Sequence, residues 1–160
     1  MCNMINLKSY IAKYICIVWP LGFFPIAPGS AASIFAAVVG YFVNKNFGSD
    51  LTFLLGIIIG FIGWWSVKVY LQKIKHKDPS EVVIDEFSGQ LIASSAAGLS
   101  PFLNLLSFLI FRILDILKPG IIKRAEKLSG SLGVMMDDWI AGILTFFILR
   151  ILFANSVYLS

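Results

Sequence analysis

Three long stretches of this chain contain no charged residue, and they constrain its fold more than any other feature. They cover residues 14–44, 51–67 and 87–111. A membrane-spanning helix needs about 20 predominantly apolar residues, and fewer suffice for a helix that its neighbours partly bury. The chain is 58% hydrophobic, against roughly 45–50% in soluble domains, and its mean hydropathy is +0.86. The sequence therefore predicts an all-α fold, a compact multi-helix bundle embedded in a membrane.

Proline, glycine and capping residues interrupt the apolar stretches and divide them into helices. Asp78 is suited to cap a helix, Pro79 fits its first position, and Glu81 can reach back to the cap. Pro119 ends the helix before it, because a residue that precedes proline is pushed out of the α region. No strand-like alternation of useful length appears. A length of 160 residues is that of one domain, so we expect residues 1–160 to form a single membrane domain of interrupted helices. We expect helices over residues 10–21, 31–44, 51–74, 78 to about 97, 102–117 and 137 to about 153, with a short amphipathic segment at 121–128 and a flexible turn at 129–133.

Basic residues gather in two clusters next to the apolar segments. One cluster lies within residues 68–77 and the other within residues 118–127. Loops rich in Lys and Arg stay on the cytoplasmic side of a membrane, so both clusters are predicted to face the cytoplasm. Clusters of this kind commonly do no more than set the topology of the chain.

Five carboxylates stand at the ends of apolar helices, where charge is costly for a membrane protein. An ionised group next to hydrocarbon costs several kcal/mol unless it pairs, binds a cation or faces a wet cavity. A ligand set made only of oxygen atoms suits Mg²⁺, which keeps several waters and binds through a few carboxylates and phosphate oxygens. The simpler alternative is that these acids cap helices. The five are Asp85, Glu86, Asp115, Asp137 and Asp138, and we predict Mg²⁺ ligands among Asp85, Glu86, Asp137 and Asp138.

The spacing of the charged residues adds detail to this site. Glu86 points about 100° away from Asp85 on a helix, so one acid of the pair can bind metal while the other orients it. Arg112, Asp115 and Lys118 recur every three residues along one side of a helix. They form either a simple ion-pair ladder or a carboxylate held between two cations that bind phosphate.

A Pro- and Gly-rich stretch at residues 22–30 is the other candidate site. The glycines allow backbone amides to approach a ligand, Ser30 or Ser33 can cap the following helix, and the positive end of that helix attracts phosphate. A turn between two membrane helices has the same composition. His76 is the only histidine, so a two-histidine phosphatase mechanism and the common histidine-rich zinc sites are excluded. We expect no nucleic-acid partner.

Four blocks of the sequence resemble the phosphatidylglycerophosphatase A family of bacterial membrane phosphatases, in the same order. They read GFFPIAPGS at residues 22–30, VIDEFSG at 83–89, FRILDILKP at 111–119 and GVMMDDWIAG at 133–142. The chain departs from the family pattern in two places. It has Gly120-Ile121-Ile122 where the family usually has Trp-Pro-Ile, and Ala32-Ser33 where a glycine often precedes the serine. Neither change removes a charged group, so substrate preference is the property that they affect.

The resemblance implies Mg²⁺-dependent hydrolysis of phosphatidylglycerophosphate to phosphatidylglycerol and inorganic phosphate, at the cytoplasmic face of the bacterial inner membrane. Direct attack by water and a phospho-aspartyl intermediate both remain open, as does the oligomeric state. One alternative is a small divalent-cation transporter that uses the same carboxylates, although transporters bind ions near the bilayer midplane, and another is a non-catalytic scaffold. Catalytic roles are predicted for Asp85, Glu86, Arg112, Asp115, Lys118, Asp137 and Asp138, and substrate binding for Gly29, Ser30, Arg112 and Lys118.

Overall fold

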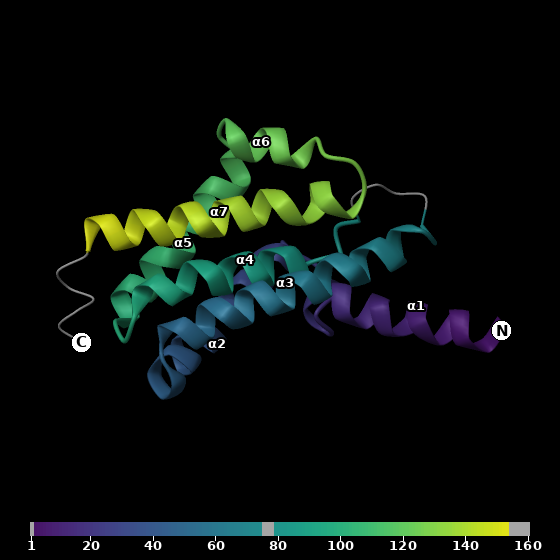
Figure 1. Cartoon of the computed structure of the whole chain (residues 1–160), viewed down its shortest axis with the longest axis horizontal. Coiled ribbons are helices and arrows are strands. Elements are labelled where there is room, and N and C mark those ends of the chain that lie inside the picture. The colour runs from purple at the N-terminus through teal and green to yellow at the C-terminus, as the bar shows by residue number, and fades with distance from the viewer. Residues whose placement is uncertain (1, 75–78, 154–160) are drawn as a thin grey trace.

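The computed structural model of the protein describes residues 2–74 and 79–153, and these residues form helices and connecting turns without a strand. Figure 1 shows the long helices α3 and α7 running along the molecule with the shorter α4 beside them, while α6 stands out from the bundle. The all-α prediction is confirmed. The elements are α1 Cys2–Cys16, η1 Leu21–Phe23, α2 Pro28–Phe47, α3 Ser49–Leu71, α4 Ile84–Ser94, η2 Ser95–Ala97, α5 Pro101–Leu117, α6 Ile121–Glu126 and α7 Ser131–Leu152.

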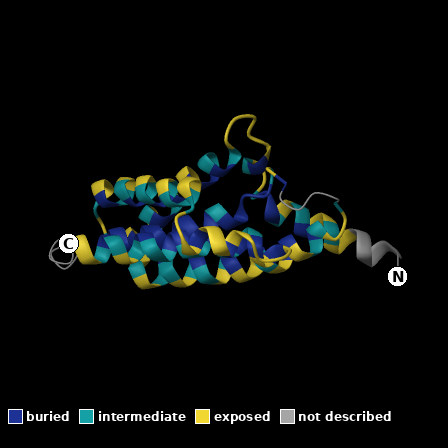
Figure 2. Cartoon of the chain, turned by 90° about the horizontal axis from the view of Figure 1, so that it is seen from above, coloured by how far each residue is buried: buried dark blue, intermediate teal, exposed yellow. Residues whose placement is uncertain are grey.

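The short helix α4 forms the centre of the bundle. All of its residues except Glu86 are buried, because α2, α3, α5 and α7 pack around it. Figure 2 shows buried residues along the middle of the molecule and exposed residues on its outer helix faces. A helix that is covered on all sides has no polar face, so the acids in its first turn lie inside the protein.

Two glycines bring α4 and α7 into backbone contact. A Cβ atom on Gly89 would lie 2.6 Å from the carbonyl oxygen of Asp138, and one on Gly142 would overlap the backbone of Gly89. Small residues at a helix interface allow this close approach. The contact fixes α7, and the acids that it carries, against the start of α4.

Buried polar side chains fix the position of α5 in the same bundle. The Gln90 side-chain amide donates to Ser94 Oγ at 2.9 Å and to Ser107 Oγ at 3.2 Å. The side-chain amide of Asn104 donates to the carbonyl oxygen of Ala37 on α2, at 3.0 Å. Such bonds between helices satisfy polar groups in an apolar interior, and they set the helix that carries Arg112 and Asp115.

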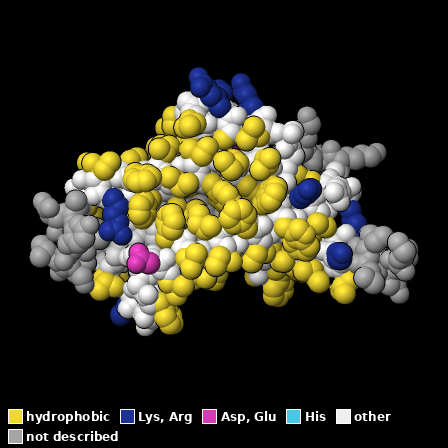
Figure 3. Space-filling view, in the orientation of Figure 1, with side chains coloured by type: hydrophobic (Ala, Val, Ile, Leu, Met, Phe, Trp, Pro, Cys, Tyr) yellow, Lys and Arg dark blue, Asp and Glu magenta, His cyan; other side chains and the backbone are white. Residues whose placement is uncertain are grey.

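The outer surface suits a membrane. The helices α3 and α7 are each long and apolar enough to cross one. Large apolar side chains such as Phe61 and Ile151 are exposed, and Figure 3 shows hydrophobic side chains covering most of one face of the molecule. A soluble monomer rarely exposes an apolar surface of this extent, so the fold agrees with association of the chain with a membrane.

The predicted start of the fourth helix was wrong. Asp78 lies outside the described residues, as do Lys75, His76 and Lys77, and the chain at residues 79–83 is not helical. The hydroxyl of Tyr70 donates to Glu81 Oε1 at 2.8 Å, so the Glu81 side chain is engaged with α3. The amide of Val83 donates to the carbonyl oxygen of Cys16 at 2.9 Å. These tertiary bonds override the local capping pattern, and the helix begins at Ile84.

Other observed helix boundaries also differ from the predicted ones. The segment expected as a flexible turn at 129–133 contains the start of α7. Gly130 precedes the helix with a positive φ of 66°, which glycine adopts without strain, and the helix begins at Ser131. The first helix ends at Cys16 rather than residue 21, and α2 begins at Pro28 rather than residue 31. Ala27 precedes α2 in the left-handed region, with no side-chain hydrogen bond at the cap. The hydroxyl of Ser33 donates to the carbonyl of Gly29 at 2.9 Å, within the helix.

Candidate active site

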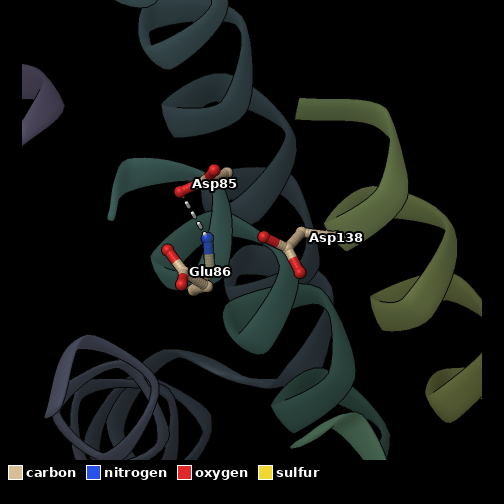
Figure 4. Close-up of side chains that lie close together, drawn as sticks. All are labelled: Asp85, Glu86 and Asp138. Atoms are coloured by element: carbon tan, nitrogen blue, oxygen red, sulfur yellow. Dashed lines mark hydrogen bonds between the residues drawn. The ribbon is translucent and has the colours of Figure 1, made fainter. Parts of the chain in front are cut away.

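Three carboxylates from two helices converge on one space. Asp85 and Glu86 lie in the first turn of α4, and Asp138 lies on α7. One oxygen from each lies within 4.8 Å of the others, and Figure 4 shows the three groups around a common space. The amide of Glu86 donates to Asp85 Oδ1 at 3.1 Å, which holds the Asp85 carboxylate in place. Although the two neighbouring acids leave the helix in different directions, the longer side chain of Glu86 brings its carboxylate into the same space.

This cluster fits a divalent cation. Glu86 Oε2 and Asp138 Oδ1 are buried and accept no hydrogen bond from the described residues. Asp85 and Asp138 are only 7% and 3% exposed. Burial, together with the neighbouring Glu86 carboxylate, raises the pKa of Asp85 well above its usual range. Unpaired buried carboxylates are costly, and an all-oxygen set of this kind is what Mg²⁺ or Ca²⁺ takes as ligands.

Arg112 lies beside the acid cluster. Its guanidinium Nη1 is 2.6 Å from Asp115 Oδ2, one turn further along α5, and 4.0 Å from Glu86 Oε1. The Nε of Arg112 is buried without a hydrogen-bond partner among the described residues. Burial raises the pKa of Glu86 above its usual range, and the negative charge of Asp115 adds to this effect. Hydrogen bonding with Asp85 and the positive charge of Arg112 offset the rise only in part. Arg112 is therefore held by Asp115 with donor capacity left over, which suits it to bind an anion next to the acids.

Lys118 is engaged with Asp137 and Glu126 rather than continuing the ladder to Asp115. Its Nζ donates to Glu126 Oε1 at 2.7 Å and to Asp137 Oδ2 at 2.8 Å. Burial lowers the pKa of Lys118, but these two carboxylates outweigh it and raise the pKa above its usual range. Lys118 also ends α5 in a left-handed conformation with φ of 45°. Asp137 thus faces Lys118, whereas its neighbour Asp138 faces the three-carboxylate cluster.

Glu126 is a site residue that the sequence reasoning missed. It lies at the end of α6, eight residues beyond Lys118, on a different helix. No spacing rule for a single helix links the two positions. The signal that was available is only compositional, namely an acid in an otherwise basic amphipathic segment.

These residues line one pocket with a volume of about 940 Å³. Ligand pockets in proteins span roughly 300–1,000 Å³, so this one has room for far more than a phosphate group. Gly29 is part of the lining, and a Cβ atom there would overlap the carboxylate of Glu86. Ser30 is not part of the lining. The lining includes Asp85, Glu86, Arg112, Asp115, Lys118, Asp137 and Asp138, together with Glu126, Lys127 and the turn at 128–130.

Trp139 ties the two acid-bearing helices together next to the pocket. Its indole Nε1 donates to Ser88 Oγ at 3.0 Å, and that hydroxyl donates to the carbonyl oxygen of Asp85 at 3.0 Å. The ring lies directly against Gly60 of α3. Because Trp139 follows Asp138 in the chain, this contact helps to set the separation of Asp85 and Asp138.

Comparison with known proteins identifies relatives of this chain. A model of the family described as "Phosphatidylglycerophosphatase A" matches residues 14–153. A "Putative phosphatidylinositol-3-phosphatase" of Bacteroides thetaiotaomicron is 34% identical over 139 residues, which cover 81% of this chain and 86% of that protein. The phosphatidylglycerophosphatase A of Escherichia coli is 34% identical over 134 residues, 78% of this chain and 73% of that protein. The phosphatidylglycerophosphatase A of Haemophilus influenzae is 30% identical over 119 residues, 73% of each. No solved structure matches the chain.

Proposed function

Since the chain belongs to the phosphatidylglycerophosphatase A family and is therefore a phosphatase, we propose that it hydrolyses phosphatidylglycerophosphate to phosphatidylglycerol and inorganic phosphate with the aid of Mg²⁺. The observation that carries the proposal is the buried cluster of Asp85, Glu86 and Asp138, with two unpartnered oxygens, beside Arg112 in a single pocket. Family membership also favours a phosphatase over a cation transporter, although both would use buried carboxylates.

Asp85, Glu86 and Asp138 would hold the Mg²⁺ ion, and Asp137 contributes through Lys118. When bound, the ion supplies positive charge that offsets the charge on the phosphoryl oxygens. Arg112, positioned by Asp115, donates to the same oxygens, and a guanidinium fork suits that geometry. Lys118, positioned by Asp137 and Glu126, adds a second positive charge. In the net reaction the bond from phosphorus to the glycerol oxygen breaks, and that oxygen takes up a proton from water. The hydroxyl that remains from the water joins phosphorus, so phosphatidylglycerol and inorganic phosphate are released.

The direct test of this function is phosphate release by the purified protein. We expect phosphatidylglycerophosphate in detergent micelles to yield inorganic phosphate when Mg²⁺ is present, and activity to disappear with a chelator and return when Mg²⁺ is added back. Phosphate release that is unaffected by chelation would contradict the metal assignment, and cation flux into liposomes without any hydrolysis would support the transporter.

We also propose that the protein resides in the bacterial cytoplasmic membrane with its pocket facing the cytoplasm. Lys127 lines the pocket and Lys123 and Arg124 lie on the helix before it. Lys68 lies in the last turn of the candidate span α3, and Lys73 follows that helix. Basic loops remain on the cytoplasmic side, so the two basic regions and the pocket between them belong to the same side.

Single cysteines can test this topology. Lys73→Cys and Ser129→Cys are exposed positions near the pocket end. Asn46→Cys is the matched control, because Asn46 is exposed at the end of α2, just before α3 begins. In a chain with Cys2 and Cys16 changed to serine, a membrane-impermeant maleimide is expected to label the first two only in inside-out vesicles and the control only in intact spheroplasts. Labelling of Lys73→Cys and Ser129→Cys from opposite sides would break the single-pocket arrangement.

A further inference from the structure

The proposed substrate carries two phosphate groups, and the acid cluster accounts for only one of them. The terminal phosphomonoester is the group that is removed. A phosphodiester, one glycerol unit away, joins the headgroup to the diacylglycerol and stays in the product. A pocket of about 940 Å³ leaves space for this second group beside the first. The inference that follows rests on the proposed function and names the residue that recognises the phosphodiester.

Three cationic side chains line the pocket, and they differ in how far their charge is already neutralised. Arg112 is paired with Asp115, and Lys118 is paired with both Asp137 and Glu126. Lys127 forms no ion pair with any residue in the part of the chain that the structure describes. Its charge is therefore available to an anionic ligand without breaking an existing pair.

The fold holds Lys127 at the outer part of the pocket. It follows Glu126 directly, and the Glu126 carboxylate holds Lys118. Ile122 and Ala125 are buried where α6 packs on α7, so the end of α6 is anchored. Lys127 is exposed, whereas the acids that would hold the metal ion are mostly buried. Figure 3 shows basic side chains at the top of the molecule, where Figure 1 places α6.

The charged groups that line the pocket therefore differ between its buried end and its rim. The buried end offers carboxylates for a metal ion and Arg112 for a phosphomonoester. The rim offers the unpaired ammonium of Lys127, a compact charge with three donors that binds phosphate oxygens without demanding one orientation. An anion that enters with its terminal phosphate first brings its second phosphate to the rim.

We propose that Lys127 is the specificity-determining residue that binds the phosphodiester of the substrate. The enzyme would then select lipids in which a phosphomonoester and a phosphodiester are separated by a short polyol. Phosphatidic acid has a single phosphate, attached directly to the diacylglycerol, and gains nothing from Lys127.

The test compares two substrates in Lys127→Gln and in a matched control. Lys123→Gln removes an exposed lysine of α6, the helix that Lys127 directly follows, and Lys123 does not line the pocket. In mixed micelles, we expect Lys127→Gln to lower kcat/KM for phosphatidylglycerophosphate by about tenfold, chiefly through KM, and to leave kcat/KM for phosphatidic acid within about twofold of the parent. Lys127→Arg should restore most of the loss, and Lys123→Gln should resemble the parent. Raising the ionic strength should shrink the difference between parent and variant.

Several outcomes would overturn the inference. An equal loss for both substrates would mean that Lys127 only shapes the pocket, and no loss for either would mean that the phosphodiester binds elsewhere. A parent that hydrolyses phosphatidic acid as efficiently as phosphatidylglycerophosphate would also refute it, while leaving the chain a lipid phosphatase. A parent that releases no phosphate from phosphatidylglycerophosphate would refute the proposed function itself, and the inference with it.

Discussion

Asp85→Asn and Asp138→Asn are each expected to lower kcat for phosphatidylglycerophosphate by at least about 100-fold while the protein stays folded. Each change removes the charge of a proposed metal ligand with almost no change of shape. Metal coordination contributes several kcal/mol to stabilisation of a phosphoryl transition state, and about 1.4 kcal/mol corresponds to a factor of ten in rate. Steady-state phosphate release measures the effect, and circular dichroism in detergent checks the fold.

Asp50→Asn is the matched control for these variants. Asp50 is an exposed acid in the first turn of α3, outside the pocket, so its loss should leave kcat unchanged. Because each variant loses a carboxylate oxygen that is proposed to bind the metal, we also expect Asp85→Asn and Asp138→Asn to bind Mg²⁺ more weakly. Calorimetric titration with Mg²⁺ measures this without turnover. Parent-like activity and parent-like Mg²⁺ affinity in both variants would refute the assignment of the cluster.

Arg112→Ala is expected to lower kcat/KM by at least about 100-fold, and Arg112→Lys should fail to restore it. A planar guanidinium can donate to Asp115 and to phosphate oxygens together, whereas a lysine ammonium acts as a point charge. Loss of one preorganised donor at a developing anion typically costs about 10²–10³ in kcat. Initial rates at a range of substrate concentrations separate the effects on kcat and KM.

Arg124→Ala is the control, since Arg124 is an exposed arginine on α6 that does not line the pocket. It should retain parent kcat/KM in the same micelles. If Arg112→Lys matched the parent, the geometry of the guanidinium would be irrelevant and Arg112 would serve only as a partner of Asp115.

The sequence was most informative where local signals decide the structure. The helix predicted at 102–117 is observed at Pro101–Leu117, because Pro101 and Pro119 mark its ends and Ser100 caps it by accepting from the Leu103 amide at 3.2 Å. The acids at the ends of apolar segments were recognisable for a similar reason, since a charged residue beside an apolar segment is visible in the sequence itself.

The sequence was least informative where distant residues meet. Asp137 and Asp138 are neighbours of the same type, and which of them reaches the cluster depends on the rotation of α7 about its axis. That rotation is set by the contact between Gly89 and Gly142, which no local pattern reveals. The hydrogen bond from Lys118 to Glu126 depends in the same way on tertiary packing. So does the hydrogen bond from Tyr70 to Glu81, which accompanies the later start of α4.

The cluster also has a consequence for the assembly of the protein. Its carboxylates come from positions about fifty residues apart, on two helices whose backbones touch at Gly89 and Gly142. In the unfolded chain these groups are scattered, so a cation would bind the native state alone and stabilise it by mass action, by about 2.7 kcal/mol at one hundred times its dissociation constant. Without the cation, mutual repulsion of the negative charges opposes the close packing of α4 on α7. A cation bound there would link α4 to α7. The same ion that takes part in the proposed reaction would then also stabilise the packing of the helices that hold it.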